Sequence, residues 1–198
     1  MSPILGIWAS QNYPRSTTAY ESIATATGNG TSGTITFSSI PATYKHLQIR
    51  YMGQTARATY PDDALGMQFN SDTGSNYSYH ILRVDETSTT VIAESGANQT
   101  GTNSGYGSLG GSGGSSLYWG VGVIDILDYA NTNKYKTVRI LAGGENNTAI
   151  STVLGSVGLS SGLWRSTSAI TSVSLYSAAT GANFTTNTQF ALYGIKGS

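Results

Sequence analysis

Apolar and polar side chains alternate along many short segments of this chain. Leu47, Ile49 and Tyr51 are separated by polar residues, and Met67 and Phe69 flank Gln68. Because successive side chains of a β-strand point to opposite faces, this pattern predicts strands with one buried face. Gly, Asn, Pro and Ser bound the segments, as expected of turns. The predicted strands are Tyr20–Ala26, Thr34–Ser38, Leu47–Tyr51, Met67–Phe69, Tyr77–Val84, Thr89–Glu94, Leu117–Leu127, Tyr135–Leu141, Ser151–Val157, Ile170–Ser177 and Phe190–Ile195.

The sequence has almost no segment in which apolar residues recur at helical spacing. No segment carries a sustained apolar stripe of helical period, and only Asp125–Asn131 suggests a single turn, which Asp128 is placed to cap. Many short strands with frequent turns are typical of sandwiches and barrels. The sequence therefore predicts an all-β protein, a single jelly-roll-like antiparallel β-sandwich with an extended N-terminal arm.

The low-complexity stretch Ser95–Ser116 affects the domain assignment. It is rich in Gly and Ser and has few side chains to bury, so it reads either as a linker between two domains or as a surface loop. Neither half of the chain holds enough strands for a closed sandwich, which favours the loop. We expect an arm over residues 1–18 and one sandwich domain over residues 19–198, with a Gly/Ser-rich loop at 95–116.

The N-terminal segment combines an apolar tip with a polar spacer. Ile4, Leu5, Ile7 and Trp8 precede the polar stretch Ser10–Thr18. These four side chains are the candidate protein-interaction site, in an arm that docks into a neighbouring subunit. An edge strand of the chain's own sandwich explains the segment equally well. The segment has no basic region and does not read as a secretory signal.

Composition narrows the function classes. Charged residues make up 10% of the chain, against about 25% in typical proteins, and the formal net charge is zero. A nucleic-acid binder needs a basic face, so we expect no nucleic-acid partner. No apolar run approaches the roughly 20 residues of a membrane-spanning helix, so we expect no membrane partner. Near-neutrality removes the charge repulsion that keeps proteins apart and therefore eases self-association.

The chemistry-bearing residues form no recognisable motif. The chain has no cysteine, and His46 and His80 each lie in a strand pattern. Asp62 and Asp63 follow Pro61 in an expected turn, and Asp72 begins an Asp-Thr-Gly turn, so structural roles explain these residues better than catalysis. Matches to a serine-hydrolase motif within 110–114 come from low complexity. We expect a non-enzymatic protein with no catalytic residue, no metal and no cofactor.

The tyrosines are more suggestive, because they combine a large apolar face with a polar tip. Most of the 13 suit core and edge packing in strands. Others suit contacts with subunits or with sugars.

Six segments that run from one end of the chain to the other resemble small structural virion proteins of tailed bacteriophages. They are Met1–Ser10, Phe37–Arg50, Phe69–His80, Gly122–Gly143, Ser161–Tyr176 and Phe190–Lys196.

This resemblance implies a virion component that is assembled in the host cytoplasm and contacts other capsid or tail subunits, and it carries no catalytic motif. Our leading hypothesis is a capsid decoration (cement) protein that stabilises the head as a homo-oligomer, most simply a trimer. The alternative is a tail-fibre or spike domain that binds a host surface polysaccharide.

Overall fold

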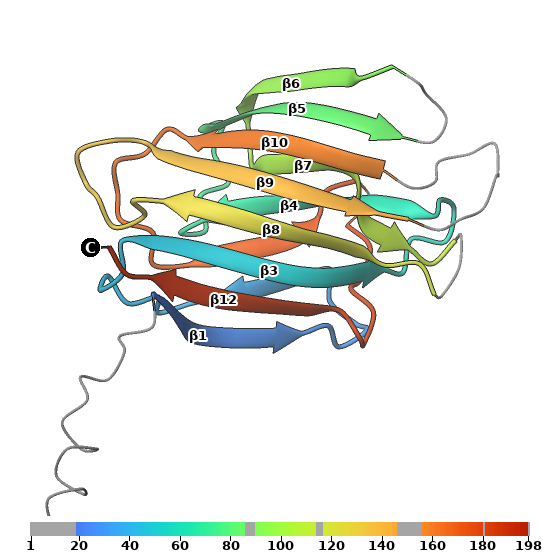
Figure 1. Ribbon diagram of the computed structural model, residues 1–198, viewed down its shortest axis with the longest axis horizontal. Helices are drawn as coiled ribbons and strands as arrows, with labels where there is room; N and C mark the ends of the chain where they lie inside the picture. Colours follow the sequence, from blue (N-terminus) through green and yellow to red (C-terminus); the bar gives the residue numbers. More distant parts are fainter. Residues whose placement is uncertain (1–18, 86–89, 114–116, 146–155, 180, 198) are drawn as a thin grey trace, which may run out of the picture.

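Two layers of β-strands form the protein in the computed structural model, which describes residues 19–85, 90–113, 117–145, 156–179 and 181–197. Figure 1 looks onto the larger layer, with the smaller layer behind it. No helix occurs in the described ranges. The predicted all-β sandwich is therefore confirmed.

The larger layer is antiparallel throughout. Its strands, in spatial order, are β1 (Tyr20–Thr27), β12 (Gln189–Ile195), β3 (His46–Thr55), β8 (Gly120–Leu127), β9 (Lys136–Gly144), β10 (Ser156–Trp164), β5 (Tyr77–Asp85) and β6 (Ile92–Gln99).

The smaller layer has four strands, also antiparallel to one another. In spatial order they are β2 (Thr34–Phe37), β11 (Val173–Ser177), β4 (Asp62–Phe69) and β7 (Thr102–Gly111).

A short parallel pairing joins the layers at one corner. Gln54 of β3 pairs with Gly110 of β7, and Thr55 pairs with Gly111. A Cβ atom on Gly110 would lie 2.3 Å from the Tyr118 carbonyl oxygen, so only glycine lets the backbones approach this closely.

The core lies between the layers and follows the alternation seen in the sequence. Leu47 and Ile49 of β3 are fully buried, whereas Arg50 and Met52 on the same strand face outward. Buried aromatic rings fill the space, with Tyr51 stacked on Phe190 at a centroid distance of 5.3 Å. Burying each such large apolar side chain contributes roughly 1.5–3 kcal/mol.

Two expectations about local structure are wrong. The stretch expected to be a loop at 95–116 holds the end of β6 and all of β7, because its glycines allow the tight junction with β3 and β8. Asp62 and Asp63 begin β4 instead of forming a turn. The single turn expected within Asp125–Asn131 is confirmed, because β8 ends at Leu127 and a turn follows at 128–130. The predicted arm, residues 1–18, lies outside the described residues.

Candidate functional site

The outer face of the larger layer carries an unusual group of exposed apolar side chains. We call it the apolar face and define it by seven residues that are 36–60% exposed. They are Met52, Leu82, Val84, Val121, Leu141, Val157 and Leu159. The four sequence-predicted interaction residues, Ile4, Leu5, Ile7 and Trp8, lie outside the described residues, and their role stays a prediction.

Strand register brings these seven side chains together. Met52, Val121, Val157 and Val84 lie in one row across β3, β8, β10 and β5, with Gly143 of β9 in the middle. Because Gly143 has no side chain, it leaves a shallow hollow between Val121 and Val157.

The neighbouring row completes the apolar face. Leu141, Leu159 and Leu82 are consecutive partners across β9, β10 and β5, and Val123 of β8 continues the row. The two rows therefore form one continuous apolar surface over β8, β9, β10 and β5. On β3, Met52 extends the first row, whereas Arg50 ends the second.

A polar row borders this surface along the same strands. Gln48 Nε2 donates to Asp125 Oδ1 at 2.9 Å, and Arg139 Nη2 lies 3.2 Å from Asp125 Oδ2. Arg50 Nε donates to Gln48 Oε1 at 2.8 Å, and its guanidinium lies over the Tyr20 ring at 5.6 Å. An apolar centre with a polar margin is the usual anatomy of a protein interface.

The outer face of the smaller layer is chemically different. A cleft of about 450 Å³ there is lined mainly by hydroxyl and amide side chains. They come from Thr34, Gln68, Ser71, Thr73, Thr100, Ser174 and Tyr176. Tyr176 packs closely over Gly101, where a Cβ atom would lie 2.1 Å from the tyrosine oxygen.

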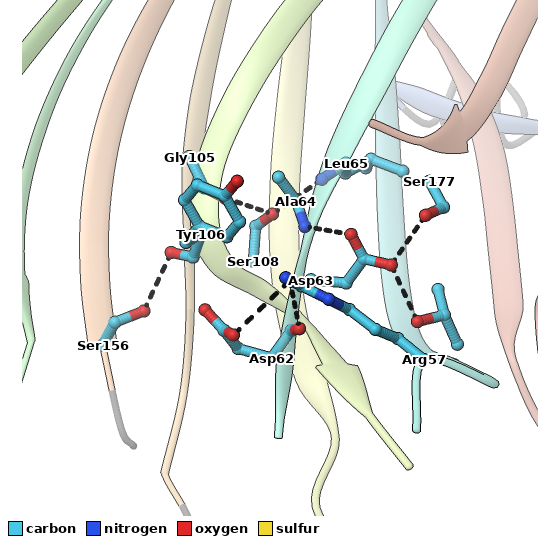
Figure 2. Close-up of polar contacts among 11 residues, drawn as sticks. Arg57, Asp62, Asp63, Ala64, Leu65, Gly105, Tyr106, Ser108, Ser156 and Ser177 are labelled. Atoms are coloured by element: carbon cyan, nitrogen blue, oxygen red, sulfur yellow. Dashed lines mark hydrogen bonds and ion pairs between the residues drawn. The ribbon is translucent and has the colours of Figure 1, made fainter. Parts of the chain in front are cut away.

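The junction between the layers buries two neighbouring carboxylates (Figure 2). Asp63 is completely buried and accepts three hydrogen bonds, from Thr55 Oγ1 at 2.8 Å, Ser177 Oγ at 2.6 Å and the Ala64 amide at 2.7 Å. These bonds tie the ends of β3, β4 and β11 together. Asp63 is thus a structural residue whose oxygens are already occupied.

Asp62 has a different environment. Its side chain is 2% exposed, and Arg57 Nη1 lies 3.7 Å from Oδ1 and donates to the Asp62 carbonyl at 2.9 Å (Figure 2). The Arg57 guanidinium also lies 4.3 Å from the Tyr60 ring centroid and 5.6 Å from that of Tyr106. Burial raises the pKa of Asp62, and the nearby Arg57 charge opposes that rise. The pair thus has one buried acid and its counter-charge, and the neighbouring carboxylate of Asp63 already accepts three hydrogen bonds.

The remaining candidates from the sequence have structural surroundings. His46 Nδ1 accepts a hydrogen bond from the Asp128 amide at 2.9 Å, and His80 is exposed on the outer face of β5. The Asp128 carboxylate pairs with Lys45 and Lys134, which lower its pKa to about 2, instead of capping the turn. Within the described ranges no three His, Asp or Glu side chains gather as a metal site.

Asp72 forms a link that sequence reasoning missed. Its Oδ1 accepts from the Gly74 amide at 2.8 Å, as the predicted Asp-Thr-Gly turn requires. Its Oδ2 accepts from the indole Nε1 of Trp164 at 2.7 Å, which attaches the turn to the core. No sequence signal connects two residues that are so far apart in the chain.

The comparisons with known proteins add no family. No protein-family model matches the chain, and no curated protein is similar to it. Among the residues that the structure describes, no helix has the length and apolar character needed to span a membrane.

Proposed function

We propose that this protein is a non-enzymatic structural subunit of a tailed-phage virion, and specifically a capsid decoration protein that stabilises the head. The observation that carries the proposal is the apolar face. Together with the resemblance of six chain segments to phage structural proteins, it favours a subunit that is covered by other protein in its working state.

The apolar face is in contact with water in the isolated chain, which is energetically unfavourable. Seven large apolar side chains in two adjoining rows keep a continuous apolar surface hydrated in the isolated chain. Surfaces of this kind mark binding sites, because covering them releases about 25 cal/mol for each Å² removed from water. The chain has zero formal net charge, so repulsion between copies opposes association only weakly.

The first experiment is localisation on the intact particle, by cryo-electron microscopy or antibody labelling, with the copy number per virion. We expect many copies spread over the head. A few copies at the tail would contradict the decoration role, and absence from the particle would contradict the virion proposal.

A matched pair of variants tests whether the apolar face makes the particle contact. Leu141→Asp places a charge on the apolar face, whereas Ser174→Asp places one on the polar outer face of β11. We expect Leu141→Asp to reduce incorporation at least fivefold and Ser174→Asp to leave it unchanged. Equal incorporation of both variants would show that the apolar face makes no contact in the particle.

The arm hypothesis has its own test. Deletion of residues 1–12 is expected to leave a folded domain, since the described sandwich starts after this segment, but one that no longer incorporates. Normal incorporation of the truncated protein would refute the anchoring role of Ile4, Leu5, Ile7 and Trp8.

A second candidate function is binding of a host surface polysaccharide by a tail-fibre or spike domain. The cleft over β2, β11 and β4 favours it, because hydroxyl and amide side chains beside Tyr176 are groups that bond and stack with sugars. Binding to purified host polysaccharide that Ser174→Arg abolishes and Leu141→Arg preserves would support this function. A null result across host polysaccharides would exclude it.

A further inference from the structure

We propose that the apolar segment Ile4–Trp8 of one copy lies on the apolar face of a second copy. The proposal rests on the proposed role as an assembling subunit, and it names the surface that receives the arm.

The dimensions of the two partners agree. The row from Met52 on β3 to Val84 on β5 crosses four strand spacings of about 4.8 Å, or roughly 19 Å. The segment Ile4–Trp8 has five residues, which span about 16 Å when extended at 3.3 Å per residue.

The same comparison disfavours two apolar faces packed directly on each other. A stable face-to-face dimer uses about 20–30 residues on each side. It would therefore also have to bury the charged and amide side chains beside the seven apolar ones, among them Arg50 and Asp125. A short segment with four large apolar side chains suits a surface of this size better than a whole second sheet does.

The chemistry of the two partners also agrees along their length. Ile4–Trp8 contains no charged or hydrogen-bonding side chain except the indole of Trp8, and the apolar face contains none. The following stretch Ser10–Thr18 is polar, and the apolar face is bordered by the polar row of Gln48, Asp125 and Arg139. The segment and the surface thus match in polarity, and the polar row runs parallel to the apolar rows on which the segment is placed.

The direction of β1 favours docking of the arm on the apolar face of a second copy over docking on the apolar face of its own chain. The last residue of β1, Thr27, pairs with Gln189, which in turn pairs with Met52 of the apolar face. The first residue, Tyr20, pairs with Ile195 at the other end of β12. The strand β1 therefore runs toward the end of the sheet that carries the apolar face. The backbone is already in the ladder at Ala19, whose carbonyl accepts from the Lys196 amide at 3.0 Å. Ala19, where the described chain begins, therefore lies at the end of the sheet opposite to its own apolar face.

The reach of the spacer matches this direction. Ten residues, 9–18, extend by about 33 Å, far enough to carry Ile4–Trp8 to a neighbouring subunit without a reversal. Repeated from copy to copy, such a contact closes a ring when the rotation between copies fits, which is the geometry that the proposed trimer needs.

The cysteine-free sequence allows a direct test by disulfide trapping. One protein carries Gly6→Cys, which keeps all four apolar side chains of the arm, and a second carries Val157→Cys on the apolar face. The two purified proteins are mixed and oxidised. We expect a covalent dimer with one copy of each, at least fivefold more abundant than in a control mixture with Ser174→Cys on the opposite outer face.

Three results would overturn the proposal. Equal trapping with Val157→Cys and Ser174→Cys would show that the arm has no preferred surface. A third protein carries both Gly6→Cys and Val157→Cys. A disulfide within one chain of this protein, without trapping in the mixture of single variants, would place the arm on its own chain. Efficient dimers of Val157→Cys alone would show face-to-face packing.

The trapping result and the particle result are separable. Trapping uses purified protein without a particle, so a failure there leaves the localisation result intact. Successful trapping of a protein that is absent from the head would leave the arm contact standing and refute the decoration role.

Discussion

The pair of Arg57 and Asp62 allows a sharp prediction about stability and its pH dependence. We expect Arg57→Met to destabilise the fold by about 3–5 kcal/mol near pH 7, because removing one partner of a buried ion pair leaves an uncompensated charge. The side chains of Arg57 and Asp62 are only 10% and 2% exposed, so water replaces little of the lost interaction. Methionine fills much of the same volume, so the packing loss is small.

The pH dependence follows from the direction of the pKa shift. Burial raises the pKa of Asp62 above 3.8, so the folded state binds more protons than the unfolded state between 3.8 and the raised value. The contribution of Asp62 to stability therefore falls as the pH rises through that range. The Arg57 charge lowers the pKa of Asp62. Removing this charge therefore raises the pKa of Asp62 further and widens the pH range in which its contribution to stability changes. As the pH falls through that range, the Asp62 carboxyl of the variant becomes increasingly neutral. We therefore expect the loss to shrink toward about 1 kcal/mol, the scale of the lost ring contacts with Tyr60 and Tyr106.

The assay is urea denaturation of four proteins at pH 4, 5, 6 and 7. They are the natural chain, Arg57→Met, Asp62→Asn and the double variant. We expect the double variant to be more stable at pH 7 than Arg57→Met alone, because the amide needs no counter-charge. A loss in Arg57→Met that is the same at every pH, and unchanged by Asp62→Asn, would refute the reasoning.

Three further predictions concern other parts of the molecule. Asp128→Asn is expected to lower the free energy of unfolding by about 1 kcal/mol at pH 7, a modest loss because the lysine partners of Asp128 are half exposed. Because the pKa of Asp128 is lowered from 3.8 to about 2, this contribution is present above about pH 3.8 and is lost as the pH falls through 2. Acid titration of both proteins checks this difference. Lys136→Met is expected to cost about 3 kcal/mol in urea denaturation, because the completely buried ammonium donates to three backbone carbonyls that would lose their partner; an unchanged midpoint would contradict this role. Val157→Thr with Leu159→Gln is expected to change stability by less than about 0.5 kcal/mol but to reduce self-association in analytical ultracentrifugation, and the opposite pattern would mean that these side chains support the fold.

Much of the fold could be predicted from the sequence because most strands have one clear apolar side. In β3 the buried Leu47 and Ile49 alternate with outward residues, as the pattern indicates. The strand β7 could not be predicted in this way. Its residues from Thr102 to Gly111 are mostly Gly and Ser, and they form a strand because small residues fit the crowded junction between the layers. Such a requirement comes from distant backbones and leaves no periodic signal.

The candidate site was harder to predict, because in part of β10 the apolar residues are exposed and a polar residue is buried, the opposite of the usual pattern of a strand. In the sequence Val157 and Leu159 alternate with Gly158 and Ser160, which indicates that the valine and leucine are buried. The structure buries Ser160 and exposes both apolar residues. Only the paired positions of the neighbouring strands reveal that these side chains belong to a surface.

The reversal in β10 bears on function, because the register of this strand is fixed at its other end. Trp164 is 2% exposed and its indole is bonded to Asp72, so a shift by one residue would expose the largest side chain of the strand. With Trp164 inside, Val157 and Leu159 must face outward, and polar residues there would satisfy the same fold. The core therefore explains why these two positions are outside but not why they are apolar. The covering partner proposed above would explain both, and the contrast with the hydroxyl-lined face of the smaller layer favours that one side of the sandwich as its binding surface.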